Sequence, residues 1–121
     1  MPLVSKLTLV VVDDDQHIRR AVGRLLRSYG HHVRVFDSAE AFLASDCAAD
    51  CVILDLELPG LNGLELEERL RQEGRRLPVV FITAHDELAL RAAVHQPHRP
   101  FLKKPIDEDG LLDAIARATN H

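Results

Sequence analysis

The chain has 121 residues, which suits one ordinary domain with a sizeable core, so we expect a single domain over residues 1–121. Its formal net charge of -4 disfavours direct contact with nucleic acid, whose phosphate backbone attracts clustered Lys and Arg. The sequence has no apolar run long enough to span a bilayer and no secretory signal, which predicts a cytoplasmic protein without a membrane partner. The two cysteines, Cys47 and Cys51, lack zinc-site spacing and are expected to stay reduced.

The first half of the chain alternates between short β-branched runs and stretches of helical periodicity. Strands are predicted at residues 7–12, 32–36 and 51–54. The first helix runs from Gln16 to Tyr29, with apolar residues spaced by three and four, and Gly30 ends it. Ser38 is expected to cap a second helix that turns Phe42 inward.

The second half continues the same alternation. Strands are predicted at residues 78–82 and 101–102, and helices at 64–73 and 86–94. Asp86 is the expected cap of the second of these helices, and Pro97 prevents it from continuing. Asp107 or Glu108 opens a last helix.

Five strands that alternate with helices predict an α/β domain with a doubly wound parallel sheet. Parallel strands need crossover helices, and these helices cover both faces of the sheet. Ligands in such folds bind beyond the carboxyl ends of the strands. The pattern therefore predicts where a functional site should lie.

Polar residues follow four of the five predicted strands at their carboxyl ends: Asp13 and Asp14, Asp55, Thr83, and Lys103 with Lys104. We expect the carboxylates of the first and third strands to lie within several Å of each other, where like charges repel unless a cation offsets them. A divalent metal would offset them. An all-oxygen set of donors suits Mg²⁺ better than the softer metals.

Each of these residues also has an ordinary structural explanation. One of the aspartates at 13–15 can cap the first helix, Thr83 can be a loop residue, and Lys104 can be a solvated surface lysine. A cap accounts for one carboxylate only. The set as a whole therefore favours a functional site.

Four segments resemble the receiver domains of two-component response regulators: Val-Val-Asp-Asp-Asp at 11–15, Asp-Leu-Glu-Leu-Pro-Gly-Leu-Asn-Gly at 55–63, Phe-Ile-Thr-Ala at 81–84 and Phe-Leu-Lys-Lys-Pro at 101–105. The match extends over residues 7–118, and residues 33–40 are similar to the FixJ-type branch. The resemblance implies a flavodoxin-like strand order of 2-1-3-4-5 with five helices.

The resemblance also implies roles for the acidic residues. Asp55 would be the phosphoacceptor. Mg²⁺ would be bound by Asp14, Asp55 and the backbone carbonyl of Glu57, with Asp13 acting mainly through water. Glu57 and His85 stand at positions that tune the hydrolysis rate in the family, although His85 can equally be an exposed loop residue.

Around this centre, the resemblance implies a set of residues that respond to the phosphoryl group. Lys104, which directly precedes Pro105 in an expected cis peptide bond, would pair with the phosphoryl oxygens. Thr83 would donate its hydroxyl to the same group, and the small Ala84 would leave it open to water and donor. Phe101 would then turn inward.

The implied function is that of a phosphoacceptor in a His-to-Asp phosphorelay. A sensor histidine kinase would supply the phosphoryl group, and the domain would promote its own phosphorylation and autodephosphorylation without acting as an enzyme on outside substrates. Phosphorylation would switch the surface formed by the predicted helix at 86–94, the fifth strand and the last helix. That surface would control a fused or partner output of transcriptional type, with homodimerisation as a further expectation.

Two other functions remain open on the sequence alone. An aspartyl phosphatase or phosphotransferase is disfavoured because no second aspartate follows Asp55 at the spacing that such enzymes show. A binding module that no longer takes phosphate is disfavoured by the complete acidic set.

The segment at 95–100 departs from the family pattern, since His and Pro replace the usual Gly-containing turn, and this puts coupling through Phe101 in question. We expect either a stand-alone receiver or the N-terminal part of a longer regulator, and the FixJ-type resemblance favours the latter.

Overall fold

The computed structural model describes residues 6–85 and 99–119. Five parallel strands form one sheet in the order β2-β1-β3-β4-β5. The strands are β1 (Thr8–Val12), β2 (His32–Phe36), β3 (Cys51–Asp55), β4 (Val79–Thr83) and β5 (Phe101–Lys103). The described helices are α1 (Gln16–Ser28), α2 (Ala39–Ser45), α3 (Gly63–Gln72) and α5 (Glu108–Thr119).

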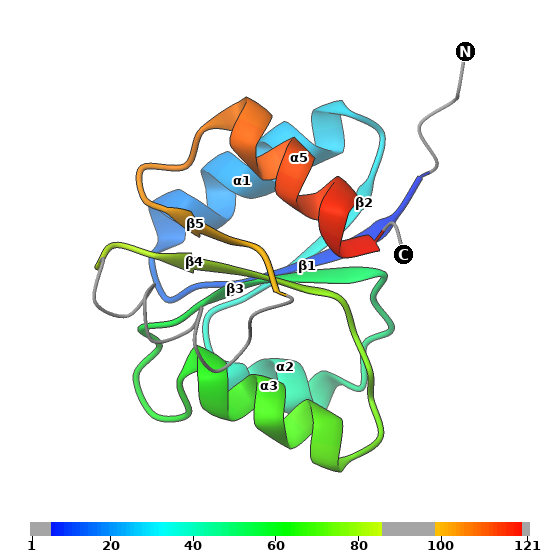
Figure 1. The fold of residues 1–121 in the computed structure, drawn as a ribbon, viewed down its shortest axis with the longest axis vertical. Coiled ribbons are helices and arrows are strands. Elements are labelled where there is room, and N and C mark those ends of the chain that lie inside the picture. The colour runs from blue at the N-terminus through cyan, green and yellow to red at the C-terminus, as the bar shows by residue number, and fades with distance from the viewer. Residues whose placement is uncertain (1–5, 86–98, 120–121) are drawn as a thin grey trace.

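The helices lie on both faces of the sheet, with α1 and α5 on one side and α2 and α3 on the other (Figure 1). Alternate side chains of β1 pack into the two hydrophobic cores, one on each face of the sheet. Leu9 and Val11 pack in the core beneath α1 and α5, whereas Val10 and Val12 pack in the core beneath α2 and α3. This explains the unbroken apolar run at the start of the chain, because a strand covered on both faces needs no polar side.

The predicted doubly wound sheet and its strand order are confirmed. The expected number of five helices is not reached within the described residues, which contain four. The helix predicted at 86–94 lies outside them. None of the four described helices has the length and apolar character that a bilayer crossing requires.

Local capping explains where the helices begin. Ser38 caps α2 as predicted, since its side chain accepts a hydrogen bond from the backbone N–H of Ala41. Helix α3 starts one residue earlier than predicted, at Gly63, because Asn62 and Glu65 form a capping box.

Two residues at element ends differ in their surroundings. Tyr29, the predicted last residue of the first helix, is the exposed C-cap of α1, and its hydroxyl donates to Glu108 Oε2 at 2.5 Å. Strand β5 lies at the sheet edge, so Pro100 beside it removes no ladder bond, and its carbonyl accepts from the N–H of Phe81 at 3.0 Å.

Candidate functional site

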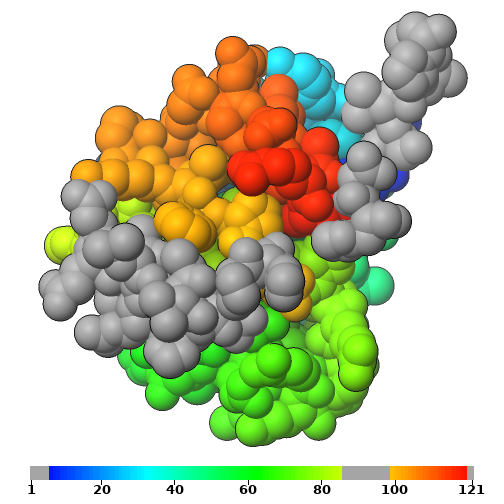
Figure 2. Space-filling view, viewed as in Figure 1, coloured from blue at the N-terminus to red at the C-terminus, as the bar shows by residue number. Residues whose placement is uncertain are grey.

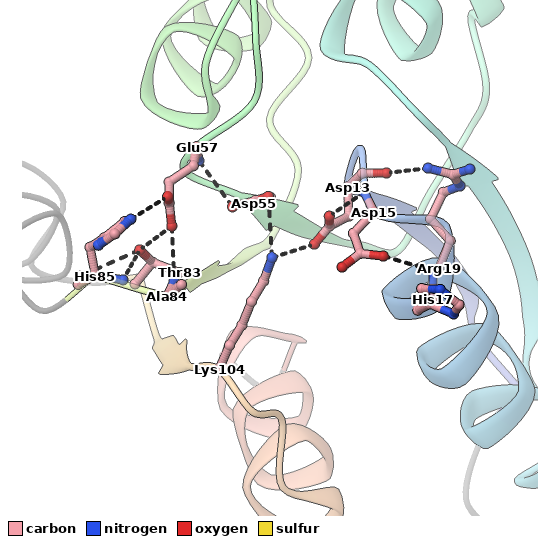
Figure 3. Close-up of polar contacts among 10 residues, drawn as sticks. All are labelled: Asp13, Asp15, His17, Arg19, Asp55, Glu57, Thr83, Ala84, His85 and Lys104. Carbon is pink, nitrogen blue, oxygen red and sulfur yellow. Dashed lines mark hydrogen bonds and ion pairs between the residues drawn. The ribbon is translucent and has the colours of Figure 1, made fainter.

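The strand register brings the ends of β1, β3, β4 and β5 to one edge of the sheet. Val12 at the end of β1 lies beside Leu54, and the next residue of β3, Asp55, lies beside Ile82. Thr83 at the end of β4 in turn lies beside Lys103. The polar residues that follow these positions therefore gather in one place (Figure 3).

Lys104 connects two of the carboxylates. Its Nζ lies 3.0 Å from Asp13 Oδ2 and 3.4 Å from Asp55 Oδ2. Both aspartates are buried, with 0% and 2% of their surface exposed, while 19% of the Lys104 side chain is exposed. The backbone N–H of Lys104 donates to the Thr83 carbonyl at 2.7 Å, which anchors the residue beside β4. The bond between Lys104 and Pro105 is cis, as expected.

Backbone hydrogen bonds fix one oxygen of each buried carboxylate. Asp13 Oδ1 accepts from the N–H of Asp15 at 2.9 Å, and Asp55 Oδ1 accepts from the N–H of Glu57 at 2.9 Å. The other oxygen of each faces the ammonium of Lys104 (Figure 3). Asp13 Oδ2 has this ion pair but accepts no hydrogen bond among the described residues.

The cap of α1 is Asp15, whose Oδ1 accepts from the N–H of His17 at 2.8 Å. Capping therefore accounts for the third aspartate and leaves Asp13 and Asp14 unexplained. Oxygens of Asp13, Asp14 and Asp55 all lie within 4.8 Å of one another, with Asp14 exposed to solvent. Three carboxylates, one reachable from water, fit a hard divalent cation such as Mg²⁺.

Burial changes how these groups hold protons. Burial, followed by the charge of Asp13, raises the pKa of Asp55 to about 6, although the Glu57 N–H and Lys104 oppose the shift. Burial also disfavours the charge of Lys104, but its contacts with Asp13 and Asp55 outweigh burial and raise its pKa. The site thus places one firmly charged lysine between two crowded carboxylates.

A second polar cluster lies beside the first, at the end of β4. Glu57 Oε1 accepts from the Thr83 hydroxyl at 3.2 Å and from the Ala84 N–H at 2.9 Å. Glu57 Oε2 pairs with His85 Nε2 at 2.8 Å. The buried Thr83 hydroxyl also receives a hydrogen bond from the N–H of His85 at 3.0 Å and lies 3.3 Å from the carbonyl oxygen of the same residue.

The response regulator receiver domain family matches residues 9–116, which is most of the chain. The chain belongs to this family. Receiver domains accept phosphoryl groups and work with histidine kinases and output domains in phosphorelay signalling, and this chain is such a domain.

Curated relatives agree with this assignment. The transcriptional regulatory protein TdiR of Thauera aromatica is 38% identical over 114 residues, which cover 92% of this chain and 50% of TdiR. The transcriptional regulatory protein FixJ of Bradyrhizobium diazoefficiens is 34% identical over 96% of this chain and 58% of FixJ. The chain thus spans about half the length of such relatives.

Solved structures agree as well. The response regulator StyR matches with a TM-score of 0.85 and 40% identity, over 95% of this chain and 60% of the StyR chain. A response regulator receiver protein from Burkholderia phymatum matches with a TM-score of 0.79 and 38% identity, over 94% of this chain and 95% of that one.

The structure brings the carboxylates of Asp13, Asp14 and Asp55 together with the Lys104 ammonium, and it places Thr83 and Ala84 in the neighbouring cluster around the Glu57 carboxylate. Phe101 of β5 is 36% exposed and lies beside Phe81 in the sheet. Sequence reasoning assigned Glu57 a backbone ligand role and a tuning role, but missed its carboxylate contacts with Thr83 and Ala84. The available signal was that Glu57 and His85 each stand two residues beyond a strand-end residue of the site.

Gly63 lets the first turn of α3 approach the end of β3. A Cβ at this position would lie 2.6 Å from the carbonyl oxygen of Asp55 and 2.9 Å from the Cα of Leu56. Both are backbone atoms, so relief of the clash requires movement of the segment that carries Asp55.

We therefore expect Gly63→Ala to lower the free energy of unfolding by at least about 2 kcal/mol in urea denaturation. The matched control is Gly110→Ala in the first turn of α5, where a Cβ meets its nearest neighbour at an ordinary 3.4 Å. It should be neutral or slightly stabilising. Equal losses for the two variants would contradict the close-approach argument.

Proposed function

We propose that Asp55 is the residue of this receiver that takes the phosphoryl group, within a single domain spanning residues 1–121. The observation that carries the proposal is the position of the Lys104 ammonium between Asp13 Oδ2 and Asp55 Oδ2, beside the exposed carboxylate of Asp14. Nothing in the packing of the sheet calls for three carboxylates and a lysine at this edge. An anionic group transferred to Asp55 would meet a positive charge already in place.

Asp13, Asp14, Asp55 and the backbone carbonyl of Glu57 would hold one Mg²⁺ in this proposal. The crowded carboxylate oxygens and the lack of a hydrogen bond to Asp13 Oδ2 among the described residues support such a cation. When bound, Mg²⁺ supplies positive charge that offsets the carboxylates and the transferring phosphoryl group.

The chemistry follows from the charges of the chain itself. The ionised carboxylate of Asp55 attacks phosphorus in line, a new bond forms from its oxygen to phosphorus, and the bond from phosphorus to the donor breaks. Lys104 stabilises the negative charge that spreads over the phosphoryl oxygens. The same groups promote the later attack of water, so the domain dephosphorylates itself and does not turn over outside substrates.

Phosphorylation is proposed to act through the end of β4 and through β5. The phosphoryl group would attract the Thr83 hydroxyl and the Ala84 N–H, and the exposed ring of Phe101 would turn inward. The residues of β5 and α5 form part of the surface on the face seen in Figure 2. A change there would reach a partner directly.

In this proposal the protein acts in the cytoplasm, and a sensor histidine kinase donates the phosphoryl group. The receiver controls an output domain or partner protein of transcriptional type, and it forms a homodimer on phosphorylation. Relatives named as transcriptional regulators support the type of output. Their greater length supports an output domain in the same chain.

The proposal is tested by incubation with acetyl phosphate and Mg²⁺ followed by intact-mass measurement. Wild-type protein should gain one phosphoryl group, and Asp55→Asn should gain none. Asp46→Asn is the matched control: Asp46 is the left-handed C-cap of α2, a position that asparagine tolerates, and it should be phosphorylated like wild type. Equal gains in Asp55→Asn and wild type would contradict the assignment, and no gain in a wild-type protein that binds Mg²⁺ would indicate a binding module.

A further inference from the structure

The carboxylate of Glu57, just after β3, accepts hydrogen bonds from Thr83 and Ala84 and pairs with His85. One oxygen accepts from the Thr83 hydroxyl at 3.2 Å and the Ala84 N–H at 2.9 Å, and the other oxygen pairs with His85 (Figure 3). Thr83 is fully buried and 27% of the Glu57 side chain is exposed, so these bonds lie at the border of the core. A carboxylate has thus been placed where two donors converge.

These two donors are the ones that the phosphoryl group on Asp55 would use. The Thr83 hydroxyl has a single proton, and both Glu57 Oε1 at 3.2 Å and the His85 carbonyl oxygen at 3.3 Å are within its reach; the Ala84 N–H likewise donates to one acceptor at a time. Asp55 Oδ1 accepts a hydrogen bond of 2.9 Å from the backbone N–H of Glu57, so the two acidic residues are joined at the end of β3. The phosphoryl group and the Glu57 carboxylate are both anionic acceptors, which makes the competition one between like groups.

We propose that Glu57 is an internal competitor of the phosphoryl group: its carboxylate engages Thr83 and Ala84 in the unphosphorylated receiver and must release them when Asp55 is phosphorylated. This inference rests on the proposed function, and it gives the Glu57 side chain a specific positioning role toward Thr83 and Ala84. His85 assists by holding the second oxygen, but its side chain is 64% exposed, so solvent weakens that pair.

The size of the effect follows from the kind of bond that is exchanged. Hydrogen bonds to a charged acceptor are stronger than neutral ones, so loss of the two bonds to Glu57 should make a phosphoryl analogue bind about tenfold more tightly. Displacement of Glu57 therefore offsets part of the favourable free energy that the phosphoryl group gains from Thr83 and Ala84. Only the remaining free energy can drive the inward turn of Phe101.

The test compares three variants by titration with beryllofluoride, a phosphoryl analogue, at saturating Mg²⁺. Glu57→Ala removes both charge and contact. Glu57→Asp keeps the charge but is one methylene too short for Thr83 and Ala84, whereas Glu57→Gln removes the charge and keeps an oxygen that can accept. We expect Glu57→Ala and Glu57→Asp to bind about tenfold more tightly than wild type, with Glu57→Gln in between.

A general effect of charge predicts a different order, in which Glu57→Asp equals wild type and Glu57→Gln equals Glu57→Ala. That order would overturn the proposal. A second readout needs no analogue: the amide proton resonance of Ala84 in the unphosphorylated protein should shift upfield in Glu57→Ala and Glu57→Asp, as a charge-assisted hydrogen bond is lost. An unmoved resonance would also overturn it.

The outcome also separates this inference from the proposed function. If wild type and Asp55→Asn both fail to bind beryllofluoride, the phosphoacceptor assignment fails, and the competitor role fails with it. If wild type binds and Glu57→Asp binds with wild-type affinity, only the role of Glu57 is overturned. Urea denaturation of each variant at about pH 8 excludes loss of the fold as the cause.

Discussion

Lys104→Met is expected to lower the free energy of unfolding of the metal-free protein by about 1–3 kcal/mol at about pH 8. The reason is that Lys104 Nζ lies 3.0 Å from Asp13 Oδ2 and 3.4 Å from Asp55 Oδ2, so its charge offsets both carboxylates. Removal leaves two buried carboxylates in mutual repulsion. The partial exposure of the lysine, 19% of its side chain, keeps the loss below that of a fully buried ion pair.

The measurement is urea denaturation in the presence of a chelator, with Lys6→Met as matched control. Lys6 is exposed to solvent and lies just before β1, at the amino end of the strand that Asp13 follows, so the control removes the same charge away from the site. Its effect should stay within about 0.5 kcal/mol. Equal losses for the two variants would show that the destabilisation comes from net charge and not from the contacts of Lys104.

The same substitution of Lys104 should slow phosphorylation of Asp55 by acetyl phosphate by about a hundredfold at saturating Mg²⁺, because a preorganised positive charge is lost from the site. Stability and rate are thus expected to fall together for one structural reason. A variant that is destabilised but phosphorylated at the wild-type rate would restrict Lys104 to a structural role.

Most of the fold was predictable because its signals are local. The run at β1 is apolar at almost every position, which only a strand covered on both faces allows, and Leu9 and Val10 do pack in opposite cores. Polar residues directly after apolar runs marked the strand ends. Because the carboxyl ends of parallel strands meet at one edge of the sheet, Asp13, Asp55 and Thr83 could be placed together from the sequence alone.

What the sequence could not supply depended on the path of the backbone and on contacts between distant segments. Three successive aspartates give no local reason to prefer one as helix cap, and only the path of the backbone selects Asp15. The bonds that Glu57 accepts from Thr83 and Ala84 join residues 26 and 27 positions apart, so they depend on the pairing of β3 with β4. Tyr29 matched the helical period, but α1 ends before it, so its ring lies outside the core.

Asp55→Asn is expected to stabilise the metal-free protein above about pH 6, by about 1–3 kcal/mol. Burial and the Asp13 carboxylate raise the pKa of Asp55 from 3.8 to about 6. Between these two values the folded state binds a proton that the unfolded state has already lost, so the free energy of unfolding falls as pH rises through this window. Asparagine does not ionise, so the variant lacks this contribution.

The measurement is the urea-unfolding free energy of both proteins from about pH 4 to about pH 8 with a chelator present. The two curves should lie closest at the acidic end, diverge up to about pH 6 and run parallel above it. A constant difference across the range would mean that Asp55 ionises with an ordinary pKa and that its carboxylate is not strained by its neighbours.

Addition of Mg²⁺ should reverse the order of the two proteins. A ligand that binds only the folded state adds stability that grows with its concentration, about 2.7 kcal/mol at a hundredfold excess over its dissociation constant. The wild-type protein offers the full set of Asp13, Asp14 and Asp55, whereas the variant lacks one carboxylate and should gain much less. The charge repulsion that destabilises the protein without Mg²⁺ is therefore the same feature that makes the site bind a cation. If Asp55→Asn loses both the destabilisation and the stabilisation by Mg²⁺, both effects depend on the Asp55 carboxylate.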